Sequence, residues 1–168
     1  FLVRRALPGA RVYDLLDTGV YLALSREPGR LAQEIRPREK LVVIDEIQRL
    51  PDLLHEVHRL IEERGIRFVL TGSSARKLRR GGVNLLGGRA LINDLFPLTA
   101  AELGSDFDLD AVLNWGSLPA VISESDQPTR AAMLESYFAA YLREEIREEQ
   151  VVRQLDPFTR FLEVAAQT

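Results

Sequence analysis

The sequence of 168 residues contains no cysteine, and it has only one tryptophan, one methionine and two histidines. Without cysteine there can be no disulfide and no thiolate-bound metal, a composition that is usual for intracellular proteins. The sequence has no apolar run near the roughly 18 residues of a membrane-spanning helix, and it shows no signal-peptide pattern. We therefore expect a cytoplasmic protein without a membrane segment.

Charge of one sign is not in large excess either. The formal net charge is −3, from 22 basic and 25 acidic side chains, which argues against a nucleic-acid-binding surface over the whole chain. One local basic cluster consists of Arg76, Lys77, Arg79 and Arg80. It leaves nucleic acid or an acidic protein surface open as a partner, although a solvated face is the simpler interpretation.

Both ends of the chain fall within helical patterns. The first residue is phenylalanine, and residues 1–7 already have the composition of a helix interior. The last residues, F-T-R-F-L-E-V-A-A-Q-T, stop inside an apolar helical pattern. We therefore interpret the chain as a fragment of a longer protein.

Strand and helix patterns alternate in the first half of the chain. Strands are predicted over residues 11–15, 40–47, 67–70 and 90–96. Helices are predicted over residues 18–36, with an interruption near Pro28-Gly29, and after Pro51. The continuous apolar run at 41–44 is typical of a strand buried on both faces of a parallel sheet. This alternation predicts an α/β fold in which helices flank a parallel sheet.

Beyond Pro97 the alternation stops. Helical patterns follow over residues 99–103, 109–115 and 129–153. Thr99, with Glu102 three residues later, predicts a capping box at the start of the first of these helices. We therefore expect a helical layer to follow the sheet.

Two adjacent carboxylates, Asp45 and Glu46, follow the apolar run of the central predicted strand. In parallel α/β sheets, chemistry collects at the carboxyl ends of the strands. One carboxylate there can hold Mg²⁺ through its waters, and a second can polarise a water molecule. Successive strand residues point to opposite faces, which would separate the two tasks. The alternative is a solvated acidic turn.

Small hydroxyl residues follow the next predicted strand. Thr71, Ser73 and Ser74 surround Gly72. Hydroxyls at a neighbouring strand end can hold an attacking water or a phosphate oxygen. The alternative is that at least one of these serines caps the following helix.

Several motifs together resemble one large bacterial and archaeal family of AAA-like P-loop ATPases. The motifs are L-V-V-I-D-E-I-Q-R-L-P-D-L-L, R-F-V-L-T-G-S-S-A-R-K-L, N-L-L-G-G-R, L-F-P-L-T-A-A-E-L and Y-L-R-E-E-I. The resemblance covers essentially the whole chain. It implies a P-loop NTPase core over residues 1–97, a helical lid over 98–155 and the start of a C-terminal domain over 156–168. It also implies binding and hydrolysis of ATP with Mg²⁺.

The same resemblance implies roles for particular residues. Asp45 corresponds to the Walker B aspartate that coordinates Mg²⁺, and Glu46 to the residue that activates water. Gln48, Thr71 and Ser73 stand where such ATPases keep polar residues that contact or sense the nucleotide.

Arg89, in the motif G-G-R, is the implied candidate for an arginine that reaches phosphate in its own or a neighbouring subunit. Action on a neighbouring subunit would require a homo-oligomer. The alternative is a local ion pair of Arg89 with Asp94 or Glu102.

The chain departs from the family pattern at one essential point. The motif G-x-x-x-x-G-K-[ST], which forms the phosphate cradle, does not occur in it. The resemblance places that loop and its strand before residues 1–7, with the strand between those at 67–70 and 90–96. Without that strand, the edges of the strands at 67–70 and 90–96 must pair with each other or with another polypeptide. We expect the chain alone to hydrolyse ATP poorly or not at all. The alternative function is that of a non-catalytic, degenerate ATPase that recruits or regulates a protein partner.

Overall fold

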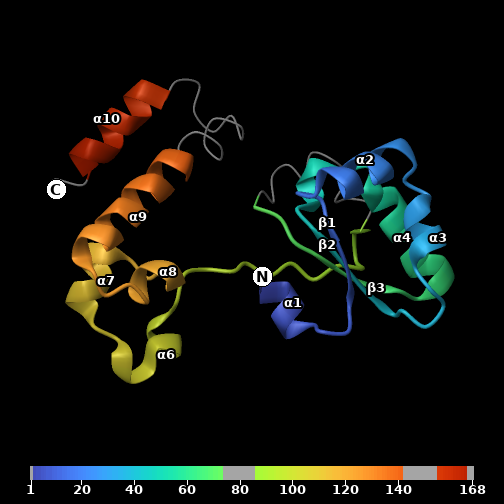
Figure 1. The fold of residues 1–168 in the computed structure, drawn as a ribbon, viewed down its shortest axis with the longest axis horizontal. Coiled ribbons are helices and arrows are strands. Elements are labelled where there is room, and N and C mark those ends of the chain that lie inside the picture. The colour runs from blue at the N-terminus through green and yellow to red at the C-terminus, as the bar shows by residue number, and fades with distance from the viewer. Residues whose placement is uncertain (1, 74–85, 142–154, 166–168) are drawn as a thin grey trace. The chain divides into compact units, whose positions relative to one another are not determined.

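The computed structural model describes residues 2–73, 86–141 and 155–165, which form two compact units over residues 1–90 and 91–168 (Figure 1). Each unit is described by itself. The basic cluster at residues 76–80 and Ser74 lie outside the described residues. The domain limits expected at residues 97 and 155 remain predictions.

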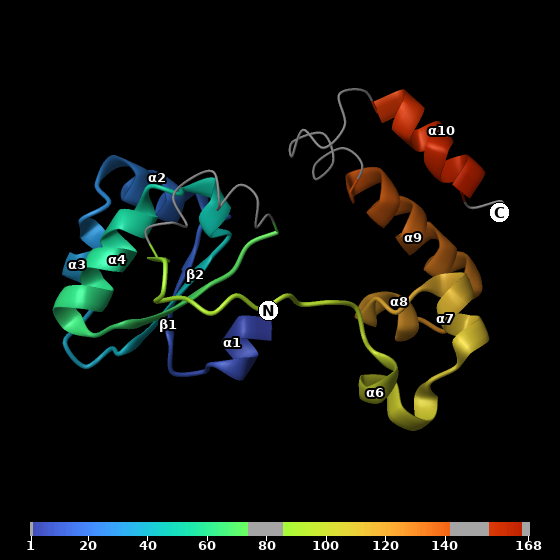
Figure 2. The same cartoon turned by 180° about the vertical axis from the view of Figure 1, so that it is seen from behind.

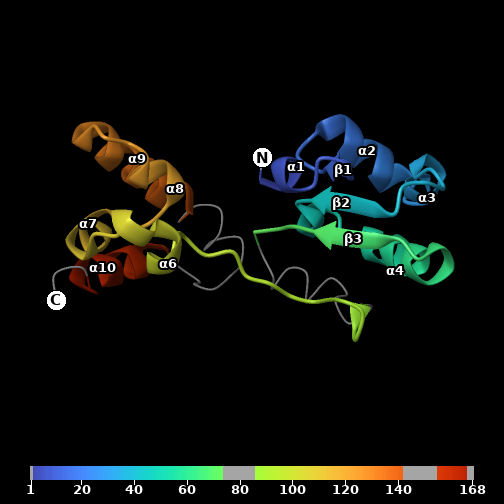
Figure 3. The same cartoon turned by 90° about the horizontal axis from the view of Figure 1, so that it is seen from below.

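A three-stranded parallel sheet forms the centre of the first unit. It consists of β1 (Arg11–Asp14), β2 (Leu41–Asp45) and β3 (Arg67–Leu70), in the spatial order β1-β2-β3. Asp14 is in register with Asp45, and Ile44 with Leu70. Figure 3 shows the arrows of β2 and β3 pointing the same way. The predicted parallel α/β arrangement is confirmed, and it brings the carboxyl ends of all three strands to one edge.

Helices precede the first strand of this sheet and connect the strands. They are α1 (Leu2–Ala6), α2 (Thr18–Arg26), α3 (Arg30–Glu34), the short 3₁₀ helix η1 (Ile47–Arg49) and α4 (Leu53–Arg64). Figure 2 shows α2, α3 and α4 next to one another beside the sheet. The break between α2 and α3 falls at the predicted pair Pro28-Gly29, and α4 ends at Gly65, whose φ of 59° suits glycine.

The core of the first unit lies between the sheet and these helices. Val42 and Ile44 of β2 are fully buried against apolar side chains of the helices. The helix residues in this core include Leu24, Leu31, Leu53, Leu54, Val57 and Leu60. Val43, which points to the other face of the sheet, is also fully buried. Burial on both faces therefore confirms the prediction made from the continuous apolar run.

The strand predicted over residues 90–96 is wrong, because these residues have no regular secondary structure. Leu91, Leu95 and Phe96 are 94%, 84% and 73% exposed. A strand forms only when its backbone groups find a partner strand. In the described part of the chain β3 pairs with β2 alone, so the direct pairing of 67–71 with 90–96 is not formed.

The described residues of the second unit that have regular secondary structure are helical. They form α6 (Ala100–Leu103), the 3₁₀ turn η3 (Gly104–Asp106), α7 (Leu109–Trp115), α8 (Pro119–Ile122), α9 (Gln127–Tyr141) and α10 (Leu155–Ala165). The capping box of Thr99 and Glu102 is present as predicted. The predicted helix over 129–153 is seen as α9, and its residues from 142 lie outside the described part.

The helices α7 and α8 both contact α9. The guanidinium of Arg130 lies over the ring of Trp115, 5.3 Å from its centroid, and joins α9 to α7. In neither unit is a described helix long and apolar enough to cross a membrane.

Candidate functional site

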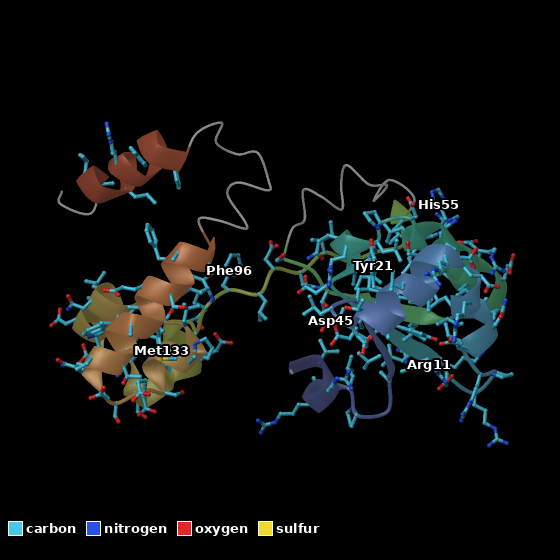
Figure 4. All side chains as sticks on the ribbon, turned by 45° about the horizontal axis from the view of Figure 1, so that its top comes forward. Arg11, Tyr21, Asp45, His55, Phe96 and Met133 are labelled. Carbon is cyan, nitrogen blue, oxygen red and sulfur yellow. The ribbon has the colours of Figure 1, made fainter. Side chains whose placement is uncertain are left out.

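The carboxyl ends of β2 and β3 are joined by a contact between two side chains. The hydroxyl of Thr71 donates a short hydrogen bond to Oδ1 of Asp45. The backbone fixes this placement, because the amide of Thr71 donates to the carbonyl of Ile44 at 3.1 Å and the carbonyl of Thr71 accepts from Ile47 at 3.0 Å. Asp45, labelled in Figure 4, is half-buried at this edge. The two residues predicted at neighbouring strand ends are therefore in contact.

Glu46 does not continue the strand, contrary to the expectation that it alternates with Asp45. The strand β2 ends at Asp45, and Glu46 has φ 60° and ψ 42°, in the left-handed region. This conformation costs a residue with a side chain about 1–2 kcal/mol. Glu46 is the one non-glycine residue with positive φ in the described part of the chain. Its carbonyl accepts from the amide of Arg49 at 2.9 Å and starts η1.

Gln48 and Ser73 belong to the same edge. The side-chain amide of Gln48 donates a short hydrogen bond to Oε2 of Glu46, and it donates to the hydroxyl of Ser73 at 3.2 Å. The loop after β2 and the loop after β3 are thus tied together by one side chain. We call this group the acidic edge; it consists of Asp45, Glu46, Gln48, Thr71 and Ser73.

Arg89 is not part of the acidic edge. Its guanidinium pairs with Glu62 through Nε and Oε1, and its Nη1 donates to the carbonyl of Gly87 at 3.4 Å. Glu62 lies near the end of α4, which leads into the start of β3, whereas Thr71 follows the end of that strand. The predicted alternative partners were Asp94 and Glu102, and the described ion pair is with neither. The sequence offered no signal for Glu62, which lies on a different element.

Sequence reasoning missed two residues near the acidic edge. Asp14 ends β1 in register with Asp45, and its Oδ1 accepts from the amide of Leu16 at 2.9 Å. In the sequence, the signal for Asp14 was its position as a polar residue at the end of a predicted strand. Arg49 donates to the carbonyl of Leu15 at 2.8 Å and lies 5.4 Å from the ring centroid of Tyr21. It fixes η1 to the loop after β1.

The oxygen atoms of the acidic edge fit Mg²⁺ in the form that keeps most of its waters. No group of three or more His, Cys, Asp or Glu residues that could hold a metal occurs among the described residues. Magnesium in nucleotide sites needs one or two carboxylates, with the remaining ligands from water and phosphate. Asp45, held by Thr71, suits that role. The chain contains no phosphate-cradle motif to hold the nucleotide.

A separate pocket lies within the second unit. Its lining includes Asp106, Asp108, Val112, Trp115 and Arg130. None of the predicted site residues lines it. Asp108 caps α7 by accepting from the amide of Ala111, and Arg130 binds the carbonyl of Glu124. These residues therefore already have structural roles.

Comparison with known proteins connects the acidic edge to a family. Residues 11–104 match a family described as an AAA domain. The chain is also 30% identical over 111 residues to the uncharacterized protein Rv2008c of Mycobacterium tuberculosis, and equally to the uncharacterized protein Mb2031c of Mycobacterium bovis. These matches cover 64% of the chain and 25% of each relative, so the matched part spans about a quarter of the relatives' length. No solved structure matches.

Proposed function

The chain belongs to the family of AAA domains, and from this membership and the geometry of the acidic edge we propose that it binds and hydrolyses ATP in the natural protein. The observation that carries the proposal is the contact of Thr71 with Asp45 beside Glu46. This contact places oxygen atoms that can bind a cation next to a carboxylate that can act as a base. Both lie at the carboxyl edge of a parallel sheet, where such folds bind small molecules.

Each carboxylate of the edge has its own task in this proposal. Asp45 holds Mg²⁺ through water, and Thr71 keeps its Oδ1 in place. When bound, Mg²⁺ neutralises the charge of the phosphate oxygens. Glu46 accepts a proton from the water that attacks the terminal phosphorus, and the bond from that phosphorus to the bridging oxygen breaks to release ADP and phosphate. Ser73, which follows β3, contacts the nucleotide, and Gln48 senses the nucleotide through its hydrogen bond to Ser73.

Arg89 takes a role between subunits in this proposal. Its side chain is 44% exposed and pairs with Glu62 away from the acidic edge. An arginine in this place reaches phosphate in a neighbouring copy more readily than in its own site. The proposal therefore includes a homo-oligomer in which Arg89 leaves Glu62 and stabilises the charge of the transition state.

A second candidate function rests on the missing phosphate cradle. Without G-x-x-x-x-G-K-[ST] in these 168 residues, the acidic edge has no partner for the phosphates within the chain. A natural protein that lacks this motif altogether would be a non-catalytic AAA domain that binds a protein partner.

The test compares ATP turnover by the natural protein with that of its Glu46→Gln variant. Losing the base is expected to lower the rate by about 10²–10⁴-fold while Mg²⁺-dependent ATP binding is kept. The matched control is Glu63→Gln, since Glu63 is an exposed carboxylate that pairs with Arg59 on α4. If the wild-type protein neither binds nor hydrolyses ATP, the non-catalytic function replaces the enzymatic one.

A further inference from the structure

The side chain of Gln48 has an unusual environment for a carboxamide. Its Nε2 donates both to Glu46 and to Ser73, on two different loops. Its Oε1 is buried and has no hydrogen-bond partner among the described residues. An unpartnered buried carbonyl is unfavourable, so the two hydrogen bonds of the donor side set the orientation of this amide. Turning the amide over would face Oε1 toward the carboxylate of Glu46, which repels it.

Gly72 makes room for this amide. A Cβ atom at position 72 would lie 2.2 Å from Oε1 and 3.2 Å from Cδ of Gln48. Real side chains do not approach so closely, so any larger residue would displace the amide. Gly72 does not adopt a positive φ, so its backbone conformation does not require glycine. Glycine at this position leaves the space that the end of the Gln48 side chain occupies.

The contact with Gln48 holds a carboxylate that stands on a left-handed turn. With β2 ended at Asp45, the sheet no longer dictates where the side chain of Glu46 points. A carboxylate on a turn samples several rotamers unless another group holds it. Nε2 of Gln48 binds Oε2 and leaves Oε1 of Glu46 without a partner in the described part of the chain. One oxygen is therefore held, and the other can meet a water molecule.

We propose that Gln48 is a positioning residue that orients the carboxylate of Glu46, and that Gly72 is the residue whose missing side chain permits it. This inference rests on the proposed ATPase function and assigns Gln48 a task beyond sensing the nucleotide. Groups that orient a catalytic residue typically change activity by about 10–100-fold when removed. The effect is on turnover, because the substrate itself does not touch the amide.

The first experiment measures kcat and KM for ATP in the natural protein. Gln48→Met keeps the length of the side chain and removes the donor, and Gly72→Ala pushes the amide away. Each is expected to lower kcat by about 10–100-fold and to leave KM within about 2-fold. Gln33→Met and Gly9→Ala are the matched controls. Gln33, on α3, makes a similar amide–carboxylate contact with Glu27, and a Cβ at Gly9 meets nothing within 4 Å.

Two double variants separate positioning from a general effect on the loops. In a Gln48→Ala background, Gly72→Ala should cost nothing further, since the shortened side chain no longer meets the new methyl group. In a Glu46→Gln background, Gln48→Met should also cost nothing further, because the amide acts through Glu46. The proposal would be overturned if the second substitution lowered kcat further in either background, or if Gln48→Met had a normal kcat.

The second experiment observes the contact without any turnover. Side-chain amide signals in ¹H–¹⁵N spectra of the 168-residue chain should place Gln48 away from the position of exposed glutamines. The signal should move in the Glu46→Ala and Gly72→Ala variants and stay in Gly9→Ala. A Gln48 signal at the position of an exposed glutamine would overturn the contact itself. A displaced signal in a natural protein that has no ATPase activity would instead overturn the proposed function, and with it the catalytic task of this contact.

Discussion

The hydroxyl of Thr71 donates to Oδ1 of Asp45, so the residue that follows β3 holds the residue that ends β2. The strands alone do not fix these two side chains. Asp45 is the last residue of β2 and Thr71 lies just past the end of β3, so no further strand pairing follows either residue. The contact fixes one oxygen of the carboxylate that we propose for Mg²⁺.

Thr71→Val is expected to raise the Mg²⁺ concentration needed for half-maximal ATP turnover by about 10-fold or more, since Asp45 loses the group that orients it. Valine has the shape of threonine and leaves the backbone bonds of residue 71 in place. Thr71→Ser keeps the hydroxyl and should retain the wild-type Mg²⁺ dependence. The measurement is a Mg²⁺ titration of turnover by the natural protein. Equal curves for the valine and serine variants would contradict the prediction.

Leu60→Ala is expected to lower the free energy of unfolding of the chain by about 2–5 kcal/mol, because it leaves a cavity in the core. Leu60 is fully buried on α4. The matched control is Leu22→Ala on α2, where the leucine is 44% exposed, and its cost should stay below about 1 kcal/mol. Urea unfolding followed by far-UV circular dichroism measures both. Similar losses for the two variants would place the core elsewhere.

Tyr13→Phe is expected to remove a loss of stability at alkaline pH. Burial, with a contribution from the nearby Glu34 carboxylate, raises the pKa of Tyr13 to about 12. A raised pKa gives stability that is complete below the unfolded value of about 10 and is lost as the pH rises through the folded value. The hydroxyl has no hydrogen-bond partner among the described residues, so at pH 8 the variant should be at least as stable as the wild type.

The measurement for Tyr13 is urea unfolding of both proteins at several values between pH 8 and about 12. The wild-type chain should lose stability relative to Tyr13→Phe across the upper part of this range. A constant difference between the two proteins would mean that Tyr13 ionises as readily in the folded chain as in the unfolded one.

Glu39→Gln is expected to destabilise the chain at neutral pH and to have less effect in acid. Hydrogen bonds from the side chain of Arg11 and from the backbone amide of Arg36 hold the pKa of Glu39 below its usual value of 4.5. A lowered pKa gives stability that is present above the unfolded value and is lost as the pH falls through the folded value.

The difference in unfolding free energy between wild type and Glu39→Gln should therefore shrink as the pH is lowered below about 4.5. Urea titrations from pH 7 down to about 3 measure it. The partly exposed position of the Arg11–Glu39 pair limits the size of the effect. A difference that does not change with pH would show that the ion pair contributes nothing.

Much of the fold could be predicted from the sequence, because its signals are local. The apolar run at 41–44 predicted a strand buried on both faces, and Val42, Val43 and Ile44 are fully buried. The pair Pro28-Gly29 predicted a break between helices, and Thr99 with Glu102 predicted a capping box. In each case the physical cause lies within a few neighbouring residues.

The candidate site was predictable only in part. The order of strands and helices predicted that the ends of β2 and β3 meet, and the structure brings Asp45 and Thr71 into contact. The alternation expected for Asp45 and Glu46 was wrong, since the strand ends one residue earlier than that alternation requires. The partner of Arg89 was also missed, because Glu62 is 27 residues away in the sequence.

The sequence by itself determined the buried strand at 41–44, the break between helices at Pro28-Gly29 and the capping box at Thr99, because backbone preferences and apolar periodicity are properties of short segments. The tertiary structure alone decided that residues 90–96 form no strand, that Glu46 turns into the left-handed region, and that Gly72 faces the amide of Gln48. Each of these depends on a partner far along the chain or on the lack of one. The sequence of a short segment does not indicate which distant atoms will pack against it.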